Sequence, residues 1–110
     1  MSLKLSETTA NGWQVIGVAG SVDSKTVNEL RDFLDEHVKG GNPVVLDLAE
    51  VPFMSSAGLR TLLTLHRQTQ ELGVSLALVG LRQEIADTMK VTGFFQYFTV
   101  FSSLSDLPPQ

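Results

Sequence analysis

One stretch of the sequence decides the fold: residues 44–59, which read VVLDLAEVPFMSSAGL. The first five residues are almost all apolar, and a short apolar run of this kind predicts a strand that is buried on both faces. Ser55 and Ser56 then precede leucines that recur at helical spacing, so a helix is expected to begin at these serines. The stretch therefore predicts a buried strand, a loop and a helix in direct succession.

The same alternation extends towards both ends of the chain. Asn11-Gly12 is a hairpin dipeptide between two strand-like runs, and Gly40-Gly41 followed by Pro43 ends a helical pattern. Strands are expected at residues 3–8, 13–19, 44–48, 74–79 and 98–101. Helices are expected around residues 27–38, 59–72 and 81–91, with a short closing helix at residues 104–107.

The resulting order is β-β-α-β-α-β-α-β-α, and all 110 residues are expected to form a single domain, residues 1–110. Strands that alternate with helices predict an α/β fold whose mainly parallel central sheet has an antiparallel edge strand. In such a sheet the functional loops gather at the carboxyl ends of the strands, here residues 20–24 and 49–58. The second helix should bury a stripe made of Leu59, Leu62, Leu63, His66 and Leu72.

Composition limits the classes of function. The net charge is −4 and the basic residues are scattered along the chain, so nucleic-acid binding, which needs a basic face, is not expected. The chain has no cysteine, which excludes disulfides and thiolate chemistry. We expect no cofactor and no metal. No apolar run approaches the ~20 residues of a membrane span and no secretory signal is recognisable, so we expect a cytoplasmic protein without direct membrane insertion.

Two interpretations apply to Ser55 and Ser56. Their hydroxyls can cap free N–H groups at the start of the helix. A helix start also carries a partial positive charge, so a serine there could accept a phosphate without disrupting the fold. The neighbouring Phe53 and Met54 would offer a partner apolar contacts if they point outward, or would anchor the loop if they point inward.

The sequence of this loop resembles a known family. Residues 54–59, Met-Ser-Ser-Ala-Gly-Leu, are similar to the signature loop of STAS domains, the fold of bacterial anti-sigma factor antagonists. That loop follows a buried strand ending in Asp-Leu and reads Asp-Ser-Ser/Thr-Gly-Leu. Residues 20–23 resemble the family's Gly-Glu-Leu/Val-Asp, and the likeness covers nearly the whole chain. Ser55 stands in place of the family's Asp, and Ala57 in place of a Ser or Thr.

The resemblance implies a binding module rather than an enzyme. Its partner would be an anti-sigma factor that is also a serine kinase, and binding would free the sigma factor. Phosphorylation of Ser56 would break the complex, and a serine phosphatase would reset it. We expect a monomer or a weak dimer. The implied partner-binding residues are Asp23, Phe53, Met54, Ser55, Ser56, Ala57 and Gly58.

Asp23 has two possible roles, either at the Ser56 hydroxyl and the metal of the kinase or as a cap of the first helix. Asp47, at the end of a strand, is expected to hold the loop backbone. An alternative function is a docking subunit of a lipid-transporting ABC complex or of a stress-signalling assembly, without phosphorylation. Hydrolase chemistry is not expected, because His66 lies ten residues along the same helix, about 15 Å from Ser56.

Overall fold

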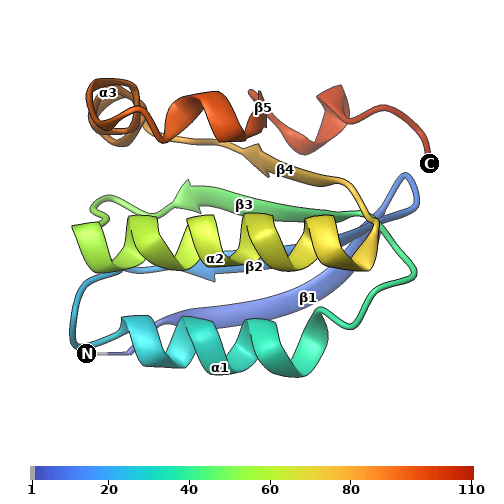
Figure 1. Ribbon diagram of the computed structural model, residues 1–110, viewed down its shortest axis with the longest axis horizontal. Helices are drawn as coiled ribbons and strands as arrows, with labels where there is room; N and C mark the ends of the chain where they lie inside the picture. Colours follow the sequence, from blue (N-terminus) through green and yellow to red (C-terminus); the bar gives the residue numbers. More distant parts are fainter. Residues whose placement is uncertain (1) are drawn as a thin grey trace.

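The computed structural model describes residues 2–110 and confirms the α/β fold. Figure 1 shows its elements in chain order. The strands are β1 (Lys4–Ala10), β2 (Trp13–Ala19), β3 (Val44–Glu50), β4 (Leu76–Val79) and β5 (Thr99–Phe101). The helices are α1 (Val27–His37), α2 (Ser56–Leu72) and α3 (Gln83–Thr92), with two short 3₁₀ turns, η1 (Phe95–Tyr97) and η2 (Leu104–Asp106).

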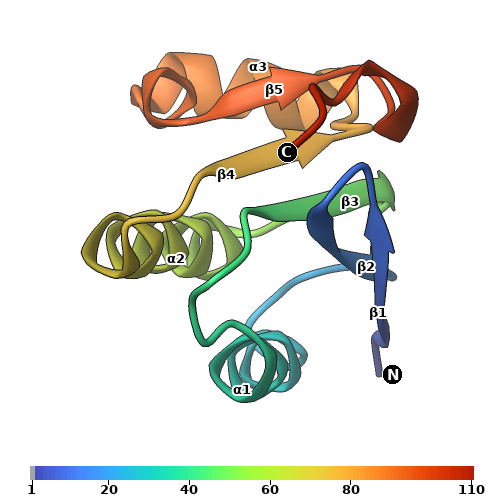
Figure 2. The ribbon, with the colours of Figure 1, turned by 90° about the vertical axis from the view of Figure 1, so that its right-hand side faces the viewer.

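The five strands form one sheet in the order β1-β2-β3-β4-β5. β1 is the predicted antiparallel edge strand, paired with β2, and the other strands run parallel. Three helices cover one face, while the C-terminal segment crosses the other (Figure 2). The carboxyl ends of β2 and β3 therefore lie beside each other at one edge, next to the start of α2.

The larger core lies between the sheet and the helices. It contains the inward residues of β2 and β3 together with Leu30 and Leu34 of α1 and Ile85 and Met89 of α3. A smaller core lies on the opposite face, where Trp13 and Leu107 are buried. These two cores explain why β3 reads as a continuous apolar run, since both of its faces are covered.

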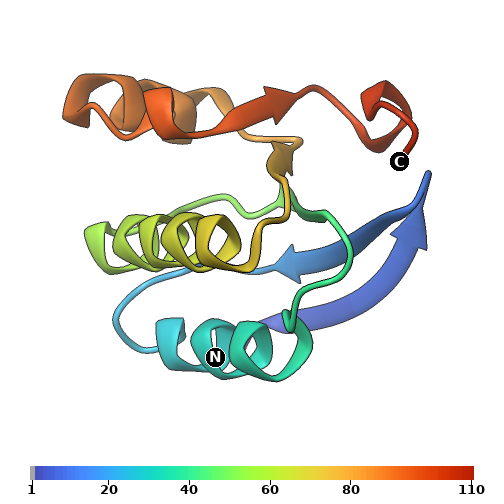
Figure 3. The same cartoon turned by 45° about the vertical axis from the view of Figure 1, so that its right-hand side comes forward.

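The C-terminal segment is tied to the β1–β2 hairpin. The indole N–H of Trp13 donates to the carbonyl of Pro108 at 2.8 Å, and the N–H of Gln110 donates to the carbonyl of Asn11 at 2.9 Å. Figure 3 shows the chain ending beside this hairpin. The expected closing helix is a three-residue 3₁₀ turn, η2, rather than an α-helix, and Leu107, which follows it, is buried in the smaller core.

The stripe predicted for α2 needs correction. Leu59 and Leu62 are buried as predicted, but Leu63 is only half-buried and Leu72 is 40% exposed. Thr61, Leu65 and Thr69 complete the buried face. His66 is half-buried, with its ring near those of Tyr97 and Phe98. Gly73 ends α2 in the left-handed conformation, with φ of 73°, as expected for a C-terminal glycine. Among residues 2–110, no helix is long and apolar enough to cross a membrane.

Candidate functional site

The two loops predicted to meet at the sheet edge are joined by backbone hydrogen bonds. The N–H of Val22 donates to the carbonyl of Phe53 at 2.9 Å, and the N–H of Ser55 donates to the carbonyl of Val22 at 2.8 Å. Val22 and Met54 thus form an isolated parallel bridge beyond the end of the sheet. Asp23 follows Val22 in the first of these loops, so the bridge places it close to the start of α2, which follows the second loop.

Ser55 and Ser56 have different roles at the start of α2. Ser55 is the N-cap, with extended backbone dihedrals (φ −78°, ψ 173°), and its hydroxyl accepts from the N–H of Gly58 at 3.4 Å. Ser56 is the first helical residue and is exposed. Within residues 2–110 its hydroxyl has no hydrogen-bond partner. The two serines therefore differ: Ser55 caps the helix, whereas Ser56 is exposed and leaves that cap unaffected.

Phe53 and Met54 point in opposite directions. The side chain of Phe53 is 54% exposed, whereas Met54 is 7% exposed and belongs to the larger core. Alternation of this kind follows from the strand-like bridge that the loop makes with Val22. Phe53 therefore presents an apolar side chain to solvent, whereas Met54 anchors the loop to the core.

Gly58 allows α2 to approach the bridged loops closely. A Cβ at this position would lie 2.6 Å from Cγ of Met54 and 2.9 Å from Cγ1 of Val22. Real Cβ contacts are not this short, so any side chain would push the loops away from the helix. Gly58 is buried, and the absence of a side chain there lets α2 pack directly against Met54 and Val22.

Asp23 closes the turn that leads into α1. Its Oδ1 accepts from the N–H groups of Lys25 at 2.9 Å and Thr26 at 3.1 Å. These hydrogen bonds, with that from Lys25 contributing most, hold the pKa of Asp23 below its ordinary value, although partial desolvation acts in the opposite direction. The N-cap of α1 itself is Thr26, which makes no side-chain cap hydrogen bond, so Asp23 closes the turn before the helix rather than capping the helix as its N-cap residue. Asp47 behaves as predicted: its Oδ1 accepts from the N–H of Ala49 at 3.1 Å.

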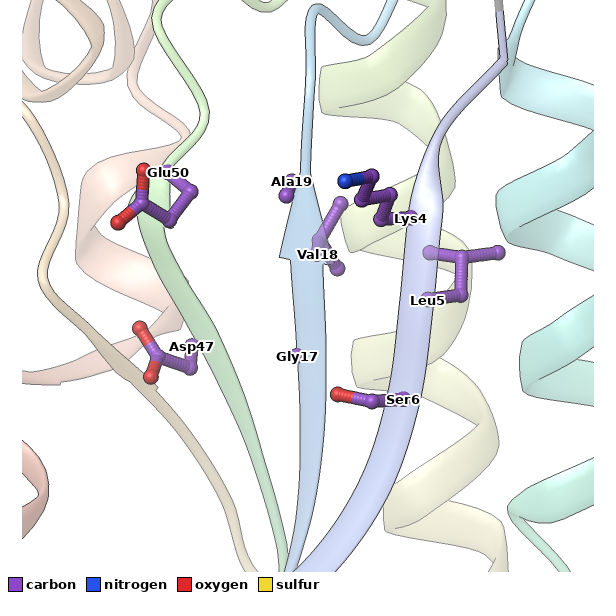
Figure 4. Close-up of a pocket in the computed structure, with 8 residues that line it drawn as sticks. All are labelled: Lys4, Leu5, Ser6, Gly17, Val18, Ala19, Asp47 and Glu50. Atoms are coloured by element: carbon purple, nitrogen blue, oxygen red, sulfur yellow. The ribbon is translucent and has the colours of Figure 1, made fainter.

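A separate hollow lies on the face of the sheet opposite the helices. It has a volume of about 210 Å³, and Gly17 and Ala19 of β2 form its floor (Figure 4). Asp47 and Glu50 line it from β3, but their carboxylates turn away from the floor. None of the residues predicted for the functional site lines it, and residues 2–110 contain no group of three His, Cys, Asp or Glu that could hold a metal ion.

Comparison with known proteins identifies the fold family. The family model of the STAS domain matches residues 5–107. This protein belongs to the STAS domain family. The predicted signature loop at residues 54–59 thus lies in a STAS domain, with Ser55 at the helix cap and Ser56 at the first helical position.

Relatives of this STAS domain include anti-sigma factor antagonists. BtrV of Bordetella bronchiseptica, a candidate anti-sigma factor antagonist, is 31% identical over 102 residues, covering 92% of this chain and 88% of BtrV. An anti-sigma factor antagonist from Mycobacterium paratuberculosis has the same fold, with a TM-score of 0.84 at 23% identity over 94% of this chain and 89% of that one.

The fold is also that of SpoIIAA, whose structure is known in two states. Its unphosphorylated form, an anti-sigma factor antagonist, matches with a TM-score of 0.73 at 14% identity over 94% of this chain and 90% of SpoIIAA. The phosphorylated form, described as a Bacillus cell fate determinant, matches with a TM-score of 0.69 at 15% identity over 94% of both chains.

Proposed function

We propose that this STAS domain is an anti-sigma factor antagonist switched by phosphorylation of Ser56. In its unphosphorylated state it binds an anti-sigma factor that is a serine kinase, and the sigma factor is released. Phosphorylation of Ser56 breaks the complex, and a serine phosphatase restores it. The domain acts in the cytoplasm as a monomer or weak dimer and has no catalytic role of its own.

The observation that carries the proposal is the free, exposed hydroxyl of Ser56 beside an independent cap. Because Ser55 holds the N–H of Gly58, Ser56 can be modified without removing the cap of α2. Its position also favours an anion, since the first turn of α2 contains no acidic residue and a helix start carries a partial positive charge. Relatives named as anti-sigma factor antagonists support the same function.

The modification is an ordinary phosphoryl transfer from Mg-ATP bound to the kinase. The Ser56 oxygen forms a bond to the γ-phosphorus while the bond from that phosphorus to ADP breaks, and the hydroxyl proton passes to a base of the kinase. The product carries about −1.5 to −2 charges at neutral pH. A carboxylate of the partner ~5 Å away, at an effective dielectric of ~20, would then be repelled by roughly 3 kcal/mol per unit charge.

The partner surface is built around Ser56 from both loops. Phe53 supplies an exposed apolar side chain, and Ser55 and Ala57 flank the acceptor. Asp23 borders this surface with a carboxylate whose Oδ1, and not Oδ2, accepts the hydrogen bonds of the turn before α1. Met54 and Gly58 contribute indirectly, by holding the loop against α2.

The test uses the kinase partner and three forms of the protein. Incubation with the kinase and Mg-ATP should add one phosphate, and peptide mass mapping should find it on Ser56. By calorimetry, Ser56→Ala should bind the kinase persistently in the presence of ATP, whereas Ser56→Glu should bind more weakly than the wild type.

Ser55→Ala is the matched control, because it removes the neighbouring hydroxyl but leaves the acceptor. It should still be phosphorylated. Phosphate on Ser55, Ser21 or Ser24 would contradict the site assignment. Equal affinities of wild type and Ser56→Glu would instead favour docking without phosphorylation, as in a transporter or stress-signalling assembly.

A further inference from the structure

Arg60 is the cation nearest to Ser56 along α2. The two residues are four positions apart on the same helix, so their Cβ atoms lie about 5–6 Å from each other on one face. Both side chains are exposed. The salt bridge found within residues 2–110 joins His37 and Glu7, so Arg60 makes no ion pair with a described residue.

The local backbone favours an approach of the Arg60 side chain to Ser56. Side chains of a helix lean towards its N-terminus, so a long side chain at residue 60 can reach back over the first turn, where Ser56 lies. The neighbouring side chains leave this path open: Ala57 is small, and Gly58 has no side chain. The first turn contains no carboxylate that would compete for the guanidinium.

We propose that Arg60 is the intramolecular partner of a phosphate on Ser56. The guanidinium donates two parallel N–H bonds to the phosphate oxygens, a geometry that suits Arg better than Lys. The phosphate is thereby held against the domain's own helix. This inference rests on the proposed phosphorylation site, and it assigns to Arg60 a role in stabilising the phosphorylated state.

Asp23 and Lys25 of the adjoining loop and Arg67 of α2 are the other charged residues that bear on this pairing. On the adjoining loop, Asp23 is negative and would repel the phosphate, while its Oδ1 is already occupied by the N–H groups of Lys25 and Thr26. Lys25 follows in the same loop as a second exposed cation. Arg67, also exposed on α2, lies almost two turns beyond Arg60 and therefore out of reach of residue 56.

The test separates this inference from the proposed function, because phosphoserine can be placed at residue 56 during synthesis without any kinase. Melting temperatures are measured for the wild type, Arg60→Gln and Arg67→Gln, each with serine and with phosphoserine at residue 56. Arg60→Gln should lower the melting temperature of the phosphorylated form by about 2–4 °C more than that of the unphosphorylated form. Arg67→Gln should lower both forms equally.

A second measurement reports on the hydrogen bonds themselves. In NMR spectra of the phosphorylated protein, the Arg60 Nε–H signal should shift and exchange more slowly with water than in the unphosphorylated protein, while that of Arg67 should not change. The proposal is overturned if Arg60→Gln lowers both melting temperatures equally, if Arg67→Gln has the same selective effect, or if the Arg60 signal is unaffected by the phosphate. Failure of a kinase to phosphorylate Ser56 would leave these results unchanged and would contradict only the proposed switch.

Discussion

Replacing Gly58 with alanine should strain the contact between α2 and the bridged loops. The new Cβ would lie 2.6 Å from Cγ of Met54 and 2.9 Å from Cγ1 of Val22, and both neighbours are buried. Overpacking of this kind costs about 1–3 kcal/mol. Alanine also favours the helix by at most about 1 kcal/mol relative to glycine. We therefore expect a net loss of about 1 kcal/mol in the free energy of unfolding.

A double-mutant cycle tests the stated cause. Met54→Ala alone should cost about 2–5 kcal/mol, because it empties a buried position. Since it also removes the atom closest to the new Cβ, the double mutant should be more stable than the sum of the single changes predicts, by about 1 kcal/mol. Urea unfolding of the four proteins measures this coupling.

The control pair is Gly58→Ala with Leu72→Ala, at opposite ends of α2. The effects of these two substitutions on the free energy of unfolding should add, since their sites share no partner. If the free-energy effects of Gly58→Ala and Met54→Ala also add, to within about 0.3–0.5 kcal/mol, steric contact with Met54 is not the reason for glycine at this position.

Three further predictions concern the helix starts. Ser55→Ala should lower the free energy of unfolding by about 0.5–1 kcal/mol, because it removes the cap of α2, whereas Ser56→Ala should change it by no more than a few tenths of a kcal/mol. Thermal unfolding compares the two variants, and equal losses of stability would contradict the division of roles between the serines. Asp23→Asn keeps an oxygen that can accept from the N–H groups of Lys25 and Thr26 in the turn before α1, but removes the charge. The pKa of Asp23 is lower in the folded protein than its ordinary value of 3.8, so the Asp23 carboxylate stabilises the folded state fully above pH 3.8. This stabilisation is lost as the pH falls through the folded pKa. The wild type should therefore lose more of its free energy of unfolding in acid than Asp23→Asn does. Denaturant unfolding at several acidic pH values measures this difference. If the free energies of unfolding of the two proteins fell in parallel with pH, the carboxylate of Asp23 would not be a source of pH-dependent stability. Ser55→Asp should be phosphorylated faster by the same kinase in single-turnover assays, since a carboxylate there would orient the hydroxyl or a metal; an unchanged rate would show that Ser55 is not a weakened replacement.

The order of elements could be predicted because each buried strand and each helix carries its own periodic signal. The buried face of α2 was harder to predict, because two of its members, Thr61 and Thr69, are polar. Thr69 is 2% exposed, and its hydroxyl donates to the carbonyl of Leu65, so its burial is satisfied within the helix. Leu72, which is apolar, is partly exposed at the end of the helix instead. The turn η1 was missed because three residues of 3₁₀ helix are too short to show a period.

The candidate site was predictable in its position but not in its internal arrangement. Strand ends that meet at one edge placed residues 20–24 and 49–58 together. The bridge between Val22 and Met54 has no sequence signal, because it depends on two hydrogen bonds between segments more than 30 residues apart. That bridge decides that Phe53 faces outward and Met54 inward, a choice that the sequence left open.

The difference between two adjacent serines follows from one backbone dihedral. Ser55 keeps ψ at 173°, outside the helical range, so its Oγ turns back towards the N–H of Gly58. Ser56 has already entered the helix, where a hydroxyl at the first position points outward from the axis. If one serine served as both cap and acceptor, adding phosphate would replace the capping hydroxyl and could alter the helix start. With the roles divided, a phosphate on Ser56 leaves that hydrogen bond in place, so the switch would act on the partner surface while the fold stays intact.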